Sequence, residues 1–330
     1  MPYTTKKFML GPDDADRRLD RILRAFLSEV PLSGIYRLFR DGNVRVSGKK
    51  AAGSYRTRLG DSVEIRLPAE DLEVQKANQA QKPLLKNETG AAQAFARMIL
   101  LETPDLAIVN KPRGMLTHGT GGVDEAAAAY FKARAALSLA FIPAPLHRLD
   151  RNTSGAVAVS ASLAGAVAFS AALRAGHIEK TYLALLEGEL RNTETWIDAL
   201  TRDPDSGVTS IQETGKRAEA SAHPLLHRDG YTLAAIRLGT GRTHQIRAQA
   251  SAHGYALAGD LKYGGRRLQG GYILHCASLG LPPGLCGPEK RLVVAPFPAE
   301  AIHRLTELFG AGFTACLPPG LAPMPSGSGR

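Results

Sequence analysis

The stretch His147-Arg148-Leu149-Asp150-Arg151-Asn152-Thr153-Ser154-Gly155 gathers charged and small polar residues between two apolar segments. Apolar residues precede it at positions 141–146 and follow it at positions 156–159. This pattern predicts a polar loop that enters a short buried strand. The carboxylate at position 150 lies between two arginines, and nearby positive charge favours its ionised form. A neighbouring carboxylate and arginine also occur as a purely structural ion pair at a loop. The charge pattern alone therefore leaves a structural and a catalytic interpretation of Asp150 open.

Four other segments combine polar residues with the signals of a turn, a strand or a helix. Asn110-Lys111-Pro112-Arg113-Gly114 predicts a sharp turn, because proline fixes φ and Gly114 allows a positive φ. Lys180-Thr181-Tyr182-Leu183-Ala184-Leu185 alternates as a strand does. Gly241-Arg242-Thr243-His244-Gln245-Ile246-Arg247 predicts a turn and then a helix to Ala252, capped by Thr243. Gly259-Asp260-Leu261-Lys262-Tyr263-Gly264 adds a glycine-bounded loop.

Together these strings resemble the signatures of the RluA-type family of RNA pseudouridine synthases. The sequence departs from the family pattern at Gln249, where histidine is usual, and at Ala220, where threonine is usual. The resemblance implies an α+β catalytic domain with a mixed, mostly antiparallel central sheet, flanking helices and a central cleft. It also implies isomerisation of uridine in RNA to pseudouridine, which needs no cofactor and no metal. The sequence itself contains no GxGxxG, no GxxxxGK[ST] and no clustered His and Cys ligands.

The resemblance assigns roles to individual residues. Asp150 is the catalytic carboxylate, either as a nucleophile at the sugar or as a base at its 2′ carbon, and Arg247 holds it ionised. Tyr182 packs on the base and carries a hydroxyl for proton transfer, although composition alone favours a core aromatic. Ile246 supports the uracil or simply fills the core. Arg148 occupies the gap left by the flipped uridine, whose extrusion costs a few kcal/mol. Further RNA contacts are expected from Arg151, Lys111 and Arg242, each of which is also explained as a solvated surface residue.

Bulk properties limit the class of protein. The 330 residues allow one large domain and a small one, and a hydrophobic content of 44% is ordinary for a globular protein. No apolar run approaches the ~20 residues that span a bilayer, and residues 1–10 lack a signal-type segment. We therefore expect a cytoplasmic protein that does not associate with a membrane. Three cysteines without CxxC spacing indicate neither a disulfide framework nor a zinc site. The net charge of +10 favours a nucleic-acid partner, although a merely basic soluble protein has the same balance.

Positive charge is concentrated in residues 1–67, which contain fourteen Lys and Arg against eight Asp and Glu. Apolar residues at helical spacing predict a helix from Leu19 to Leu27, with Asp16 as its N-cap, and a second helix over 32–40. Strands are predicted at 44–46, 54–59 and 63–65. This arrangement resembles the RNA-binding domain named after ribosomal protein S-four. The residues that carry the resemblance are Arg18-Leu19-Asp20, Gly42-Asn43-Val44-Arg45-Val46, Gly48-Lys49 and Gly60-Asp61. Ser47 departs from the domain's pattern, which commonly has asparagine at this position. The expected RNA contacts of this small α+β domain are Arg18, Arg21, Arg37 and Lys49.

These features predict four parts of the chain. They are a basic RNA-binding domain (1–67), a linker (68–95), a catalytic domain (96–315) and a disordered tail (316–330), with Pro, Gly and Ser in the tail. The combination of a basic module and this catalytic type resembles bacterial enzymes that act on large-subunit ribosomal RNA, which implies that RNA as the substrate. We expect a monomer. Transfer RNA or another RNA is an alternative substrate. A different class of protein, an inactive RNA-binding factor in ribosome assembly, is the principal rival.

Overall fold

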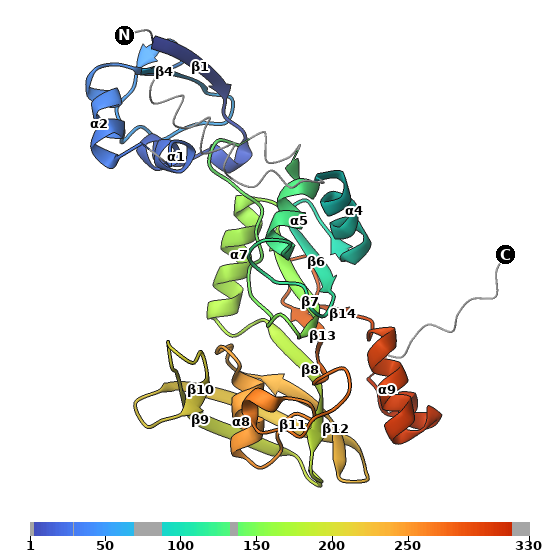
Figure 1. Ribbon diagram of the computed structural model, residues 1–330. Coiled ribbons are helices and arrows are strands. Elements are labelled where there is room, and N and C mark those ends of the chain that lie inside the picture. The colour runs from blue at the N-terminus through green and yellow to red at the C-terminus, as the bar shows by residue number, and fades with distance from the viewer. Residues whose placement is uncertain (1–2, 29, 69–87, 133–137, 319–330) are drawn as a thin grey trace, which may run out of the picture. The chain divides into compact units, whose positions relative to one another are not determined.

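The computed structural model describes residues 3–28, 30–68, 88–132 and 138–318 (Figure 1). The chain divides into two compact units. The first comprises residues 1–97, 124–144 and 160–164, and the second comprises 98–123, 145–159 and 165–330. Most of the predicted linker and of the predicted tail lies outside the described residues. None of the helices in the described ranges is long and apolar enough to cross a membrane.

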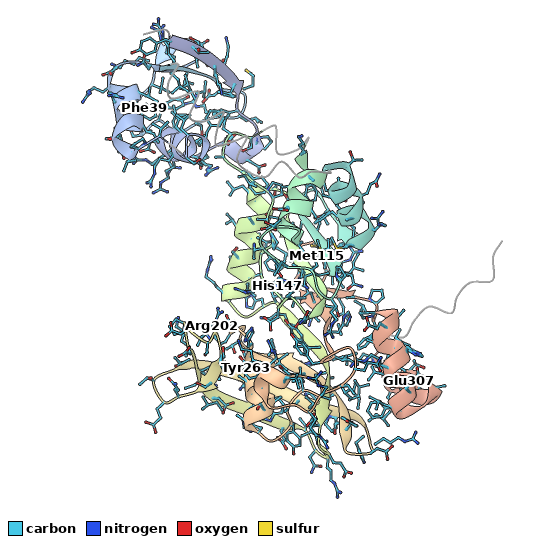
Figure 2. All side chains as sticks on the ribbon, in the orientation of Figure 1. Phe39, Met115, His147, Arg202, Tyr263 and Glu307 are labelled. Carbon is cyan, nitrogen blue, oxygen red and sulfur yellow. The ribbon has the colours of Figure 1, made fainter. Side chains whose placement is uncertain are left out.

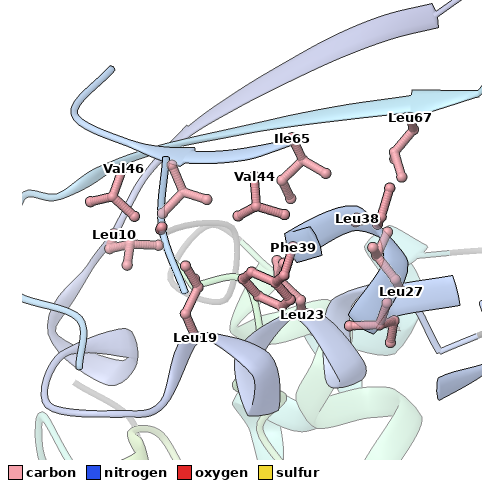
Figure 3. Close-up of a cluster of buried hydrophobic side chains, with 13 residues drawn as sticks. Leu10, Leu19, Leu23, Leu27, Leu38, Phe39, Val44, Val46, Ile65 and Leu67 are labelled. Atoms are coloured by element: carbon pink, nitrogen blue, oxygen red, sulfur yellow. The ribbon is translucent and has the colours of Figure 1, made fainter. Parts of the chain in front are cut away.

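The N-terminal part of the first unit packs a four-stranded sheet against two helices. The strands β1 (Tyr3–Met9), β4 (Ser62–Pro68), β2 (Val44–Val46) and β3 (Lys49–Lys50) lie in the order β1-β4-β2-β3 and pair antiparallel. The helices are α1 (Leu19–Phe26) and α2 (Leu32–Arg40), after a short 3-10 turn η1 (Pro12–Asp14). Figure 3 shows the core between sheet and helices, where Leu19, Leu23, Phe39, Val44 and Ile65 are buried.

Both predicted helices and the strand at 44–46 are confirmed. The cap at Asp16 is wrong, because α1 begins after Arg18 without a side-chain cap, and Asp16 itself has a positive φ. The strand at 54–59 is also wrong: only an isolated bridge between Arg18 and Arg56 forms there. Strand β1 had no sequence signal, because its side chains alternate without a buried face and its pairing with β4 is long-range.

Two more helices belong to the first unit, α4 (Glu88–Met98) and α5 (Val123–Tyr130). They are joined by aromatic contacts, with the Phe95 ring centroid 5.1 Å from that of Tyr130 and 5.6 Å from that of Phe131. Because α4 begins at Glu88, part of the range expected as a linker (68–95) is helical. Helix α5 ends at Tyr130, and residues 138–140 are not helical; residues 133–137 lie outside the described ranges.

The second unit is built on one large sheet, to which the described residues contribute ten strands. Their order is β10-β9-β11-β12-β8-β13-β7-β6-β5, with β14 paired to β13. The run from β10 to β13 is antiparallel, whereas β13 and β7 pair in parallel. The expected mixed, mostly antiparallel sheet is confirmed. The strands are β5 (Ile99–Glu102), β6 (Leu106–Lys111), β7 (Ser154–Ser160), β8 (Glu179–Glu187), β9 (Glu194–Arg202), β10 (Thr209–Ile211), β11 (Lys216–Arg228), β12 (Tyr231–Leu238), β13 (Leu274–Leu281) and β14 (Arg291–Val294).

Helices flank this sheet, as expected. They are α7 (Leu163–Arg174), α8 (Gln245–Ala252) and α9 (Ala299–Phe309), with the 3-10 turns η2 (Leu261–Tyr263) and η3 (Ala311–Cys316). Figure 1 shows α8 beside β9, β10 and β11. Leu305 and Phe309 of α9 and Phe313 of η3 are buried in one cluster with Leu183 and Leu233 of the sheet.

Gly155 explains how the polar loop joins the sheet. It has φ +113° and lies on β7 opposite Cys276 of β13. A Cβ atom at this position would overlap the backbone carbonyl oxygen of Cys276. Only glycine therefore permits the parallel pairing of β7 with β13 at this point. That pairing anchors the end of the loop that carries Asp150.

Candidate active site

Hydrogen bonds fix the loop around Asp150 on both sides of this residue. Thr117 Oγ1 accepts a hydrogen bond from Leu149 N (3.1 Å) and donates one to Leu149 O (2.8 Å). Thr153 N donates to Asp150 O at 3.0 Å. His147, which is labelled in Figure 2, stacks on Phe169 of α7, and its Nε2 accepts a hydrogen bond from Ala158 N. Burial lowers the pKa of His147 to about 3, so the ring is the neutral acceptor that this bond requires.

Asp150 faces a cavity of about 330 Å³, which also meets Tyr182 of β8 and the segment before α8. Its side chain is 17% exposed, so the carboxylate is open to a ligand rather than sealed in the core. The volume is at the lower end of the range for small-ligand pockets. The described residues that line the cavity include Arg148, Lys180, Arg242 and His244.

Arg247 contacts Asp150, but its main partner is a different carboxylate. Its Nη1 lies 3.5 Å from Asp150 Oδ2, whereas its Nε and Nη2 donate to Asp260 Oδ2 and Oδ1 at 2.6 and 2.8 Å. The guanidinium carbon lies 4.7 and 4.8 Å from the ring centroids of Tyr263 and Tyr272. Burial favours a lower pKa for Arg247, but the hydrogen bonds and charge of Asp260 raise that pKa above its ordinary value. The guanidinium is therefore a fixed cation that presents one N–H group to Asp150.

Asp260, Tyr263 and Tyr272 were not predicted as site residues. Asp260 is 2% exposed and makes the bidentate pair with Arg247. The available signal was the string from Gly259 to Gly264, since a lone carboxylate between glycines and apolar residues needs a buried partner. Tyr272 carried no comparable signal in the sequence.

Tyr182 and Ile246 lie beside Asp150, where the resemblance placed them. The Tyr182 ring is 6% exposed. Burial, together with the neighbouring Cys276 and Asp150, raises its pKa well above the ordinary value, so the hydroxyl is neutral. Ile246 of α8 lines a smaller cavity of about 50 Å³ with Asp150, Tyr182 and Leu274. These side chains supply an apolar wall next to the carboxylate.

His244 is a neighbour of Asp150 that sequence reasoning missed. Its Nε2 lies 3.7 Å from Asp150 Oδ2, and its Nδ1 lies 2.7 Å from Tyr263 Oη. His244 is also the N-cap residue of α8, with φ +55° and no side-chain cap bond. The predicted cap at Thr243 is therefore wrong, because the left-handed residue at 244 separates Thr243 from the first helical turn.

Gln249, the departure from the family pattern, is buried and bound to the sheet. Its Nε2 donates to Asp198 Oδ2 at 2.6 Å, and its Oε1 accepts from Gln245 Nε2 at 3.0 Å. Gln249 therefore fixes α8 on the sheet and does not belong to the cavity beside Asp150.

The arginines expected to contact RNA are exposed. Arg148 makes no hydrogen bond or ion pair within the described residues and lines both cavities next to Asp150. Arg242 Nε donates to Arg217 O, and Arg151 Nε donates to Gly114 O at 3.1 Å. Their charges therefore remain on the surface.

Lys111 is different, and its predicted contact with RNA phosphate is contradicted. The side chain is fully buried, and Nζ donates to the carbonyl oxygens of Pro112, Met115 and Arg151 at 3.1, 2.8 and 3.3 Å. Burial lowers its pKa to about 8. Since all three donors are used, Lys111 holds the turn at 111–115 beside the Asp150 loop and does not reach a ligand.

The four basic residues expected to contact RNA in the N-terminal part are exposed on the first unit: Arg18, Arg21, Arg37 and Lys49. Arg18 is engaged by Asp20, with Nη2 2.7 Å from Oδ2. The side chains of the other three make no ion pair or hydrogen bond in the part of the chain that the structure describes.

Comparisons with known proteins agree with this geometry. The family model described as RNA pseudouridylate synthase matches residues 105–252. "Ribosomal large subunit pseudouridine synthase C" of Vibrio vulnificus is 33% identical over 78% of this chain and 80% of its own length. The protein of the same name from Escherichia coli is 32% identical over 80% and 81%.

Among solved structures, human RNA pseudouridylate synthase domain containing 4 has a TM-score of 0.59 and 21% identity. It covers 68% of this chain and 98% of its own. Human RNA pseudouridylate synthase domain containing 1 has a TM-score of 0.51 and 25% identity over 69% and 90%. The family match and these relatives show that the chain is an RNA-modifying isomerase. The chain belongs to the RluA-type family of RNA pseudouridine synthases.

Proposed function

We propose that this enzyme isomerises uridine in large-subunit ribosomal RNA, with Asp150 as the reacting carboxylate. The names of its relatives support this RNA, and the position of Asp150 in the cavity beside Arg247 carries the assignment of the residue. In the reaction the bond between uracil N1 and ribose C1′ breaks, and a bond between C5 and C1′ forms. C5 loses a proton and N1 gains one. The carboxylate acts either on C1′ or on the 2′ proton.

The neighbouring side chains fit the needs of this reaction. Arg247 supplies a fixed positive charge 3.5 Å from the carboxylate. Tyr182 and Ile246 supply apolar surface for the uracil ring, and the neutral Tyr182 hydroxyl is available for the proton at C5. A uridine in folded RNA has to be extruded before it can enter the cavity, at a cost of a few kcal/mol. Arg148, whose guanidinium makes no hydrogen bond or ion pair within the described ranges, would stack in the gap.

We propose further that residues 1–67 form the RNA-binding module of the enzyme, and that the protein is a cytoplasmic monomer. The module's exposed Arg21, Arg37 and Lys49 leave positive charge available for phosphate groups. Tethering such a module to a catalytic domain raises affinity without new contacts in the active site.

The test is tritium release from ribosomal RNA labelled at C5 of uridine, with the wild-type chain and Asp150→Asn. We expect release by the wild type and none by the variant. Mapping of pseudouridine in host RNA with and without the gene identifies the site, and modification of transfer RNA alone would overturn the ribosomal assignment. A conventional RNA-binding protein without activity would release no tritium.

A further inference from the structure

The two oxygens of the Asp150 carboxylate have different surroundings. Arg247 Nη1 and His244 Nε2 approach the same atom, Oδ2, at 3.5 and 3.7 Å. No donor of the described residues contacts Oδ1. One oxygen is therefore approached by two nitrogen atoms, and the other makes no hydrogen bond or ion pair with the described residues.

Hydrogen-bond directions favour one position for the proton of the neutral His244 ring. The backbone N–H of Thr209 can only donate, and it lies 2.9 Å from Tyr263 Oη, so the phenol oxygen accepts this bond. The phenol proton is then free to be donated to His244 Nδ1, 2.7 Å away. With Nδ1 as the acceptor, the neutral ring carries its proton on Nε2, which faces Asp150. The opposite tautomer would place a nitrogen lone pair against a carboxylate oxygen and leave the phenol proton unused.

The surroundings also keep the imidazole neutral. Burial lowers the pKa of His244, and the positive charges of Arg247, Lys262 and Arg202 lower it further, whereas Asp150 acts in the opposite direction. The side chain is 16% exposed, and it lines both cavities next to Asp150. A neutral ring that donates from Nε2 is the form that these contacts favour.

We propose that His244 is a positioning residue for Asp150, in which the chain Thr209–Tyr263–His244 delivers an Nε2–H donor to Oδ2 and thereby selects Oδ1 as the oxygen that reacts. The inference rests on the proposed role of Asp150. If Asp150 is the nucleophile, Oδ1 bonds to C1′ as the C1′–N1 electron pair leaves with uracil, and attack by C5 later breaks the Oδ1–C1′ bond. If Asp150 is the base, Oδ1 removes the 2′ proton as the C1′–N1 electron pair leaves with uracil, and it returns that proton to C2′ when C5 bonds to C1′. The separation of 3.7 Å is expected to shorten in the RNA complex, as such contacts often do.

The test compares His244→Ala, His244→Gln and Tyr263→Phe in the full chain, by single-turnover pseudouridine formation and by RNA affinity. His244→Ala removes the donor, and Tyr263→Phe removes the group that selects the tautomer. We expect each to slow the chemical step by roughly 10- to 100-fold with little change in RNA affinity. The glutamine amide places an N–H group near the position of Nε2, so His244→Gln should recover most of the rate.

The discriminating measurement is the effect of Tyr263→Phe in two backgrounds. It should be large in the wild type and small in His244→Gln, because glutamine has no tautomer to select. Equal effects in both backgrounds, a wild-type rate for His244→Ala, or a change in RNA affinity alone would overturn the proposal. If His244→Ala does not fold, the Tyr263→Phe comparison still decides. Loss of the proposed function itself is recognised separately, since the wild type would then be inactive or Asp150→Asn would be active.

Discussion

Replacement of Asp260 by asparagine tests the pair on which the site depends. Arg247 and Asp260 are joined by two charged hydrogen bonds of 2.6 and 2.8 Å, and their side chains are only 9% and 2% exposed. Asparagine keeps the shape of the side chain but removes its charge and turns one acceptor into a donor. The guanidinium then stays buried with Asp150 as its nearest carboxylate, at 3.5 Å.

The expected cost follows from burial. Removing one partner of a buried ion pair typically costs about 3–5 kcal/mol, because the remaining charge is left without compensation. We expect Asp260→Asn to lower the free energy of unfolding by about 3 kcal/mol, near the lower limit, since the tyrosine rings and Asp150 still contact the guanidinium. Pseudouridine formation should fall as well, because Arg247 is no longer fixed beside Asp150.

Urea denaturation followed by Trp196 fluorescence provides the assay. Trp196 is the only tryptophan of the chain, is buried in β9, and belongs to the same sheet unit as the pair. Glu219→Gln is the matched control, because the Arg217–Glu219 pair has the same 2.8 Å separation but side chains that are 66% and 42% exposed. Such a surface pair contributes at most about 1 kcal/mol. Equal losses in the two variants would refute the argument from burial.

Three other changes have definite expected outcomes. Gly155→Ala should lower the free energy of unfolding by more than about 3 kcal/mol in thermal unfolding. Gly176 has φ +75° but no atom near the position of an added Cβ, so Gly176→Ala should lower it by only about 1 kcal/mol. Similar losses in the two variants would contradict the steric argument. Burial lowers the pKa of His275 to about 4 from about 6.5, so its unfolded form binds a proton first as pH falls. The free energy of unfolding should therefore fall by about 3 kcal/mol between pH 6.5 and pH 4, because the two pKa values differ by about 2.5 and each pKa unit corresponds to ~1.36 kcal/mol. The fall should be smaller in His275→Gln. Parallel pH curves would exclude this. Arg148→Met should reduce the slope of log RNA affinity against log salt by about 1, and Lys111→Met should leave that slope unchanged.

Local patterns in the sequence predicted most of the elements that carry the site. The strand after the Asp150 loop, the strand of Tyr182 and the helix of Arg247 appear where alternation and helical spacing placed them. These elements are defined by neighbours a few residues apart, so short-range spacing is sufficient to detect them. The cap residues Asp16 and Thr243 were wrong, because the left-handed residues Asp16 and His244 reshape both helix starts.

The partners of the functional side chains could not be predicted in the same way. Lys111 has the composition of an RNA contact, yet its ammonium is buried against three carbonyl oxygens, one of them 40 residues away at Arg151. Strand β1 depends on β4, almost sixty residues further along the chain. Such features are created by burial and by long-range pairing, which leave no period in the local sequence.

The sequence by itself determined the catalytic family and the succession of strands and helices around Asp150. Only the tertiary structure decided that Arg247 is held by Asp260, that His244 faces the same carboxylate oxygen, and that Lys111 is internal. The reason is physical: a strand or helix is selected by the spacing of adjacent residues, but the charge state and partner of a side chain depend on which distant groups folding brings within about 4 Å and shields from water.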